Sequence, residues 1–263
     1  MPTEHDRFRT VRVPARFFDP ATALAMRIPR FRGVVRRVRR TRSRVVDRWL
    51  RVETAAATGT VVSERLVGTD ALWYEPTDYF LMRQLLRRLP LRDSDVVLDL
   101  GCGKARPLMV LGRRRLRLCQ GVELDPVLAD VAVENARRLR GRRTPIEISC
   151  RDAIHFDYDE TTVVWFFNSF GPGTLRLALD SIEQSLDRNP RVFRFVYVNP
   201  AYECELERRT WLVRTESFSS AWHRTYGASY WESWGVRPPT ASSDRRVVEP
   251  RVRASTEDAR LNR

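Results

Sequence analysis

The sequence contains no apolar run of about 18 residues, the length that a membrane-spanning helix requires. Its N-terminus also lacks the apolar stretch of a secretory signal peptide. Charged residues make up 30% of the chain, which argues against a membrane protein. We therefore expect a cytoplasmic protein with no transmembrane segment.

Histidine and cysteine are scarce, and neither shows the spacing of metal ligands. The histidines are His5, His155 and His223, and the cysteines are Cys102, Cys119, Cys150 and Cys204. No Cys-x-x-Cys pair occurs, and buried free cysteine behaves as a small apolar residue, so we expect reduced thiols. The sequence predicts no metal site.

Lysine is almost absent, because Lys104 is the only lysine among 47 basic residues and arginine carries the net charge of +14. Arginine bias of this kind can reflect the coding composition of a GC-rich genome. The charge is unevenly spread, however, since residues 27–51 hold eleven arginines against one acid, Asp47. Three interpretations of this segment stay open: a solvated face of a helix packed on the core, a surface for nucleic acid or another acidic partner, and a contact with an anionic membrane.

Enough apolar material is present for one core, since 43% of the 263 residues are hydrophobic and 10% are aromatic. We expect a basic N-terminal arm over 1–52, a folded domain over 53–235 and a disordered tail over 236–263. Apolar residues at helical spacing predict an amphipathic helix in the arm. They are Val34, Val35, Val38, Val45, Val46, Trp49 and Leu50. The sequence does not indicate an oligomeric state.

The most informative stretch is 95–103, where a short apolar run ends in Asp99 and is followed by Gly101 and Gly103. Such a run is typical of a buried parallel strand, and the glycines allow a tight turn and a close approach to a ligand. Residues 104–113, with a proline in the first turn, then predict a helix. The unit is a strand, a glycine turn and a helix.

A second carboxylate, Glu123, ends the next apolar run, 20 residues after Gly103. In a right-handed βαβ unit the ends of the two strands lie side by side, where a carboxylate can accept both hydroxyls of a ribose. A dinucleotide fold usually carries a third glycine for the pyrophosphate, but Arg106 stands at that position. A nucleoside ligand without phosphates fits better, and a nicotinamide oxidoreductase is disfavoured.

Three ordered motifs carry a resemblance to a known family. They are Asp99-Leu-Gly101-Cys102-Gly103, Glu123-Leu-Asp125-Pro126 and Arg151-Asp152-Ala153. Their order resembles that of the class I S-adenosylmethionine (SAM)-dependent methyltransferases. The resemblance implies a Rossmann-like, mostly parallel seven-stranded sheet with one antiparallel strand and helices on both faces, and it makes 53–235 a methyltransferase domain. Ala105 stands where the family often has a third glycine.

The resemblance also implies site residues. The glycine motif, from Asp99 through Gly101 and Cys102 to Gly103, would line the methionyl part of SAM, Glu123 would hold the ribose, and Asp152 with Ala153 would meet the adenine. Asp152 has a plainer interpretation as a turn aspartate.

Residues 73–79 precede the first strand and predict a helix over 78–89 with Thr77 as its cap. In methyltransferases of this class the corresponding segment folds over SAM, and Tyr74-Glu-Pro-Thr77 resembles a motif of several protein-lysine methyltransferases. That resemblance implies a role for Tyr74 and Thr77 in closing the cofactor site.

The apolar run 162–168 predicts a central strand that delivers Asn168 to the carboxyl edge of the sheet. Asn168-Ser-Phe170-Gly resembles a stretch of non-SET histone-lysine methyltransferases, which implies a nitrogen acceptor, with Asn168 aiming it and Tyr74 and Phe170 as walls. Asn168 has a plainer interpretation as a cap for the turn 171–173. The alternatives are an RNA methyltransferase, or an inactive SAM-fold protein that uses the basic arm as an adaptor for nucleic acid or membrane.

The rest of the chain predicts supporting elements. Asp125 and Pro126 begin a helix that Gly141 stops, and residues 175–186 predict another. Residues 211–218 and 228–234 predict a closing β-hairpin.

Overall fold

A computed structural model describes residues 32–55, 68–219 and 227–233. Its centre is one seven-stranded sheet in the order β3-β2-β1-β4-β5-β7-β6, in which β7 is the one strand that runs opposite to the other six. The strands are β1 (Val96–Leu100), β2 (Leu118–Glu123), β3 (Ile146–Cys150), β4 (Val163–Phe166), β5 (Arg194–Val198), β6 (Leu212–Ser219) and β7 (Gly227–Ser233). The expected sheet, with its single reversed strand and its closing hairpin, is confirmed.

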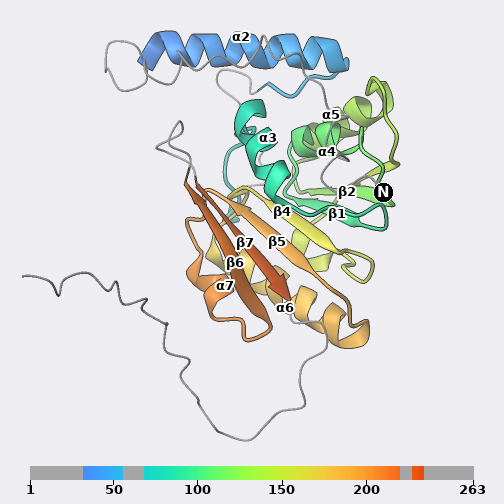
Figure 1. Ribbon diagram of the computed structural model, residues 1–263, viewed down its shortest axis with the longest axis vertical. Coiled ribbons are helices and arrows are strands. Elements are labelled where there is room, and N and C mark those ends of the chain that lie inside the picture. The colour runs from blue at the N-terminus through green and yellow to red at the C-terminus, as the bar shows by residue number, and fades with distance from the viewer. Residues whose placement is uncertain (1–31, 56–67, 220–226, 234–263) are drawn as a thin grey trace, which may run out of the picture.

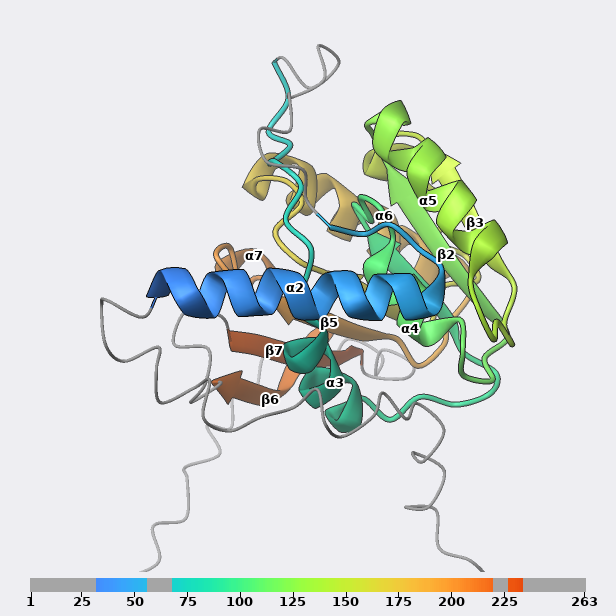
Figure 2. The same ribbon diagram turned by 90° about the horizontal axis from the view of Figure 1, so that it is seen from above.

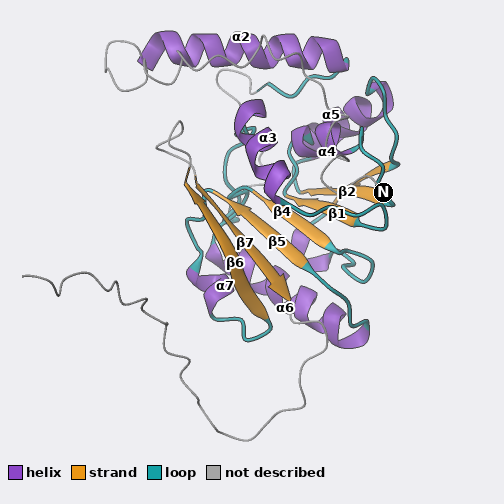
Figure 3. Ribbon diagram, in the orientation of Figure 1, coloured by secondary structure: helices purple, strands orange, loops and turns teal. Residues whose placement is uncertain are grey.

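Helices cover both faces of the sheet (Figures 1 and 3). They are α2 (Arg32–Leu50), α3 (Tyr79–Arg88), α4 (Arg106–Leu111), α5 (Pro126–Arg138), α6 (Pro172–Arg188) and α7 (Cys204–Glu207), with a short 3-10 helix, η5 (Ala153–His155). One hydrophobic cluster joins one face to the end of α2 and to α3, α4 and α5. A second joins the other face to α6 and α7. Strands β1, β4 and β5 are buried on both faces, which explains their continuous apolar sequences.

Strand register brings the ends of four strands to one edge of the sheet. Asp99 of β1 pairs with Gly121 of β2, and Glu123 pairs with Cys150 at the end of β3. Strand β4 pairs with the other side of β1 up to Leu100. The segments that follow these strands therefore meet at the carboxyl edge.

Two helix starts differ in their details from the sequence prediction. The cap of α3 is Asp78, not Thr77: its side chain accepts hydrogen bonds from the backbone N–H groups of Phe80 and Leu81 at 2.9 and 3.2 Å. Helix α4 begins only at Arg106, because Ala105 takes the left-handed conformation with φ 59°. Asp125 caps α5 as expected, with Oδ1 2.8 Å from the N–H nitrogen of Val127.

Helix α2 packs on the domain through its last turns. Val46 and Leu50 belong to the first hydrophobic cluster, whereas Val45, expected on the same face, is 41% exposed. Adjacent residues on a helix lie 100° apart, so the face centred on Val46 and Leu50 turns Val45 toward solvent. The boundary at 52–53 stays a prediction, and the expectations for 1–31 and 236–263 lie outside the described residues.

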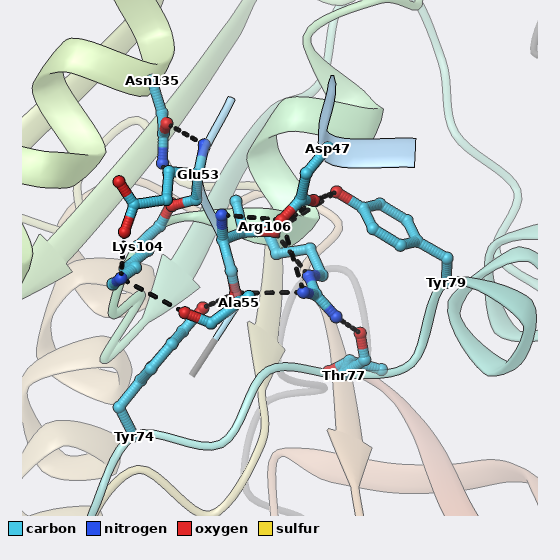
Figure 4. A network of polar contacts seen from close by, with 10 residues as sticks. Asp47, Glu53, Ala55, Tyr74, Thr77, Tyr79, Lys104, Arg106 and Asn135 are labelled. Atoms are coloured by element: carbon cyan, nitrogen blue, oxygen red, sulfur yellow. Dashed lines mark hydrogen bonds and ion pairs between the residues drawn. The ribbon is translucent and has the colours of Figure 1, made fainter. Parts of the chain in front are cut away.

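A buried acid on α2 ties this helix to three other segments (Figure 4). Asp47 accepts hydrogen bonds from the Thr54 N–H at 2.9 Å, the Thr54 hydroxyl at 2.7 Å and the Tyr79 hydroxyl at 2.6 Å. Its Oδ2 lies 3.9 Å from a guanidinium nitrogen of Arg106. Asp47 and Arg106 are 4% and 3% exposed, so each buried charge depends on the other and on these hydrogen bonds.

No helix in the described ranges is long and apolar enough to cross a membrane.

Replacing Asp47 by alanine tests this connection. Asp47→Ala leaves the Arg106 guanidinium buried without its countercharge, so we expect the free energy of unfolding to fall by about 3 to 5 kcal/mol. Urea unfolding measures the change, with the exposed Asp187→Ala of α6 as the control. A loss no larger than that of Asp187→Ala would contradict the role of Asp47.

Candidate functional site

A cavity of about 500 Å³ lies at the carboxyl edge of the sheet, where ligands bind in open α/β sheets. Its walls come from the ends of β1, β2 and β4, from the residues after β3 and from the segment 68–77. Every site residue expected from the sequence lines it: Tyr74, Thr77, Asp99, Gly101, Cys102, Gly103, Glu123, Asp152, Ala153, Asn168 and Phe170. The fold therefore brings together in one cavity residues that lie far apart in the sequence.

Side chains from two other segments pack closely against the glycine turn after β1. Gly101 and Gly103 have φ values of 72° and 53°, in the left-handed region that favours glycine. A Cβ on Gly103 would lie 2.3 Å from ring atoms of Tyr74, and one on Gly101 would lie 2.2 Å from Cβ of Ser169. Side chains at these positions would displace the walls of the cavity.

Ala105 occupies the third glycine position of the motif in the backbone conformation that a glycine favours. A left-handed residue with a Cβ costs about 1 to 2 kcal/mol, so this departure is a local strain that the surrounding packing offsets. The side chain of Ala105 is fully buried.

Glu123 is the last residue of β2, and two backbone N–H groups orient its carboxylate. Its Oε2 accepts from Gly103 at 2.7 Å and its Oε1 accepts from Asp125 at 2.9 Å. Burial raises the pKa of Glu123, and these hydrogen bonds oppose the rise. Each oxygen keeps further lone-pair capacity, so this fixed carboxylate can still accept two hydroxyls.

Asp99 is a buried carboxylate with an unsatisfied atom. The residue is 4% exposed, and its Oδ2 has no hydrogen-bond partner among the described residues. Burial, and then the nearby Glu123, raise the pKa of Asp99 well above its usual value. A buried acceptor without a donor is costly, so this position favours a ligand that brings a donor or a positive charge.

Asp152 and Ala153 follow β3. The Oδ1 atom of Asp152 accepts from the Ile154 N–H at 2.9 Å, which is the turn role that the plainer interpretation gives it. The Tyr158 hydroxyl donates to the Ala153 carbonyl at 2.8 Å and fixes this wall. Turn and cavity roles are therefore compatible at Asp152.

Cys102 contributes to the cavity within the glycine turn. Its Sγ lies against Gly121, where an added Cβ would be 2.8 Å from the sulfur. Burial raises the pKa of the Cys102 thiol well above its usual value. A buried thiol that stays protonated is not a nucleophile.

The segment 68–77 closes one side of the cavity and is anchored through Tyr74 and Thr77. The Tyr74 hydroxyl donates to the Thr54 carbonyl at 2.8 Å, and burial raises its pKa. The Thr77 carbonyl accepts from Arg106 at 3.1 Å. Thr77 thus holds this wall from behind instead of capping α3.

Arg106 was considered in the sequence only as a missing glycine, yet it joins these segments (Figure 4). Its Nε donates to the Thr54 hydroxyl at 2.7 Å and its Nη2 to the Thr54 carbonyl at 3.0 Å. Its guanidinium carbon lies 4.6 Å from the ring centre of Tyr79. In the sequence, this role was indicated only by the position of Arg106, a charged residue directly before the apolar residues of α4.

Asn168 lies at the end of β4 with φ 45°, and its amide is held by a tyrosine. The Tyr197 hydroxyl donates to Asn168 Oδ1 at 2.7 Å and accepts from the Tyr202 N–H at 3.1 Å. The expected oxygen acceptor is therefore already in one hydrogen bond and keeps one lone pair. Phe170 packs on Phe166, with ring centres 4.8 Å apart.

The turn before α6 is held by Asp70. Asp70 accepts from the Thr174 N–H at 3.0 Å and the Thr174 hydroxyl at 2.5 Å, and its carbonyl accepts from the Gly171 N–H at 2.9 Å. Asp70 therefore binds the turn 171–173 that the plainer interpretation had assigned to Asn168. No local sequence signal identified this contact, because its partners are 104 residues apart.

Comparison with solved structures gives similar chains at low identity. An RNA methyltransferase from Salinibacter ruber, in complex with S-adenosyl-L-homocysteine, is 18% identical, with a TM-score of 0.48, over 65% of this chain and 100% of that one. A TehB-like SAM-dependent methyltransferase from Corynebacterium glutamicum is 19% identical, with a TM-score of 0.44, over 58% and 86%. A geranyl diphosphate C-methyltransferase from Streptomyces coelicolor is 17% identical, with a TM-score of 0.44, over 60% and 78%.

No family model and no curated protein sequence matches the chain. The low identities and TM-scores above say nothing about what this chain binds or acts on. Its activity must be inferred from its own residues.

The raised pKa of Asp99 makes a prediction about stability. The folded protein binds the proton of the Asp99 carboxyl more tightly than the unfolded chain does. The free energy of unfolding should therefore fall as the pH rises from about 4 through the pKa of Asp99 in the folded state. Asp99→Asn lacks this loss, so its free energy of unfolding should exceed that of the wild type at neutral pH, by a margin that shrinks toward pH 4. Urea unfolding from pH 4 to 8 measures the difference, with Asp93→Asn at an exposed turn as the control. Parallel pH profiles for wild type and Asp99→Asn would contradict it.

Proposed function

We propose that this protein is a SAM-dependent methyltransferase that methylates a nitrogen atom. The observation that carries the proposal is the buried, unsatisfied Asp99 beside the fixed carboxylate of Glu123 in the cavity at the carboxyl edge. A ligand that satisfies both must present a cationic or donor group and a pair of hydroxyls. The amino group and the ribose of SAM meet that requirement.

The assignment of residues follows this chemistry. Asp99 would accept from the amino group of the methionyl part, next to the backbone of Gly101 and Gly103. Glu123 would accept the ribose hydroxyls, and Asp152 with Ala153 would meet the adenine. SAM, when bound, would supply a methyl group on a sulfonium, with the neutral thioether as the leaving group and the proton of the acceptor nitrogen released to solvent.

The acceptor side of the proposal depends on Asn168. The hydroxyl of Tyr197 donates to the amide oxygen, which fixes the orientation of the side chain and leaves one lone pair on the oxygen. An N–H of the acceptor would donate to this lone pair, so that the amine is held with its own lone pair toward the methyl group. Tyr74 and Phe170 would exclude water from the path of transfer.

An RNA acceptor is the second candidate. It is supported by exposed arginines on α2 for which the described residues provide no paired acid. A nitrogen of a base and a lysine amine would make the same demand on Asn168.

Binding of SAM tests the cofactor assignment. Hydrogen bonds to a charged acceptor are worth about 1.5 to 3 kcal/mol each, so Glu123→Ala should weaken SAM binding by roughly tenfold to a thousandfold in calorimetry. Glu147→Ala, an exposed position on β3, is the matched control and should bind as the wild type does. Unchanged affinity in a folded Glu123→Ala protein would remove the ribose assignment, and a wild type that binds no SAM would remove the whole proposal.

A separate measurement tests Asn168. Asn168→Ala should leave SAM affinity within about twofold, because the residue would face the acceptor, while methyl transfer falls by about a hundredfold or more. Radiolabelled transfer to fractionated cell extract measures it and identifies label in protein, RNA or small molecules. The control is Asn189→Ala, at the exposed end of α6. Equal labelling by wild type and Asn168→Ala would show that Asn168 has no part in transfer.

A further inference from the structure

One side of α2 presents arginines at a regular spacing. The exposed members are Arg37, Arg40, Arg44, Arg48 and, just after the helix, Arg51. Within the helix, steps of three or four residues place Arg37, Arg40, Arg44 and Arg48 on one face, over a length of roughly 17 Å, and Arg51 follows the last turn. No ion pair joins any of them to an acid within the described part of the chain. Seen from above, α2 lies in front of the other elements, and no described helix or strand covers it (Figure 2).

Further arginines adjoin the end of α2. The Leu50 carbonyl accepts from the Arg140 N–H at 2.9 Å, and the Arg113 and Arg140 guanidinium carbons lie 4.3 and 5.9 Å from the ring centre of Trp49. Burial, and then the nearby Arg143 and Arg140, lower the pKa of Arg113. Like charges are therefore crowded here, and a bound polyanion would relieve their repulsion.

We name the seven exposed residues of this set the α2 basic surface: Arg37, Arg40, Arg44, Arg48, Arg51, Arg140 and Arg143. Guanidinium groups bind phosphate oxygens through paired N–H donors, which makes arginine well suited to a phosphate backbone. The geometry points to docking of the phosphate backbone of duplex RNA on the α2 basic surface. This proposal does not depend on methyl transfer.

The packing of α2 disfavours a membrane as the occupant. A helix that lies on a bilayer inserts its apolar face into the lipid. In the last turns of α2 that face is buried against the protein, with Val46 at 6% and Leu50 at 2% exposure. The side of α2 that remains exposed to a partner is mainly charged.

The same packing favours a duplex that is bound through its phosphate backbone rather than through its bases. Arginines cover Trp49, so its ring does not offer a stacking platform for single-stranded bases. Its inner side is packed on the domain, so α2 offers a duplex only its outer, arginine-bearing side. Duplex RNA is recognised largely by shape and by contacts to its phosphates and 2′-hydroxyls.

The experiment uses the full chain and a fluorescein-labelled RNA duplex of about 20 base pairs, the length scale of a typical duplex-RNA contact. Fluorescence anisotropy measures affinity across a salt series from about 50 to 200 mM KCl, the range over which phosphate contacts weaken strongly. The triple variant Arg40→Gln/Arg44→Gln/Arg48→Gln loses three phosphate contacts and should bind at least about 30-fold more weakly near 100 mM KCl. Its slope of log affinity against log salt should be shallower by about 2 to 3.

A second triple variant is the matched control. Arg92→Gln/Arg117→Gln/Arg188→Gln makes the same change in net charge at exposed positions before β1, before β2 and at the end of α6, where the paired acids Glu160 and Asp159 are themselves largely in solvent. Its RNA affinity should stay within about threefold of the wild type. Circular dichroism confirms that both variants are folded, and SAM calorimetry shows separately whether the cofactor proposal holds.

Three results would overturn the inference. The first is an equal loss of affinity in the control variant, which would reduce the binding to net charge. The second is equal or tighter binding of a DNA duplex of the same length and sequence. The third is binding to vesicles containing phosphatidylserine with no binding to the RNA duplex. Preferential RNA binding that the α2 variant loses and the control keeps would support it.

Discussion

A charged group removed from water must find partners within the protein, and the guanidinium of Arg106 imposes this constraint on the region around the cavity. Its nitrogens donate to Thr54 and Thr77, and Asp47 supplies the countercharge. These partners come from α2, from the residues after it and from the wall of the cavity. One side chain at the start of α4 thus couples the helix of the N-terminal arm to the glycine turn.

The two acids at the centre of the cavity are buried yet differ in what their environment provides. Backbone N–H groups fix Glu123, whereas Asp99 keeps an oxygen without a partner. The first arrangement gives a carboxylate of defined orientation. The second stores an unfavourable energy that a suitable ligand would release on binding, so affinity for the ligand is gained at the expense of stability in its absence.

Helix α2 has two sides with separate roles in the molecule. Val46, Asp47 and Leu50 join it to the core, while Arg37, Arg40, Arg44 and Arg48 remain in solvent. The arm is therefore more than a solvated appendage, since its inner side contributes to the structure that supports the cavity. The unusual arginine content of the chain gains a physical meaning only where such residues are gathered on a rigid face without paired acids.

The sequence by itself indicated the individual strands and most of the helices, and it placed Asp99, Gly101, Gly103 and Glu123 at the ends of two strands, because apolar runs, the glycine turn and these carboxylates are local signals. The arrangement of the sheet and the roles of the other expected site residues came from the family resemblance. Only the tertiary structure decided how those residues are satisfied. Arg106 finds Thr54 at a separation of 52 residues, and Asp70 rather than Asn168 holds the turn before α6 at a separation of 104. Even the cap of α3 shifted by one residue, from Thr77 to Asp78, because the Thr77 carbonyl is held by Arg106. Hydrogen bonds between distant segments depend on the packing of the whole chain, which no pattern of neighbouring residues contains.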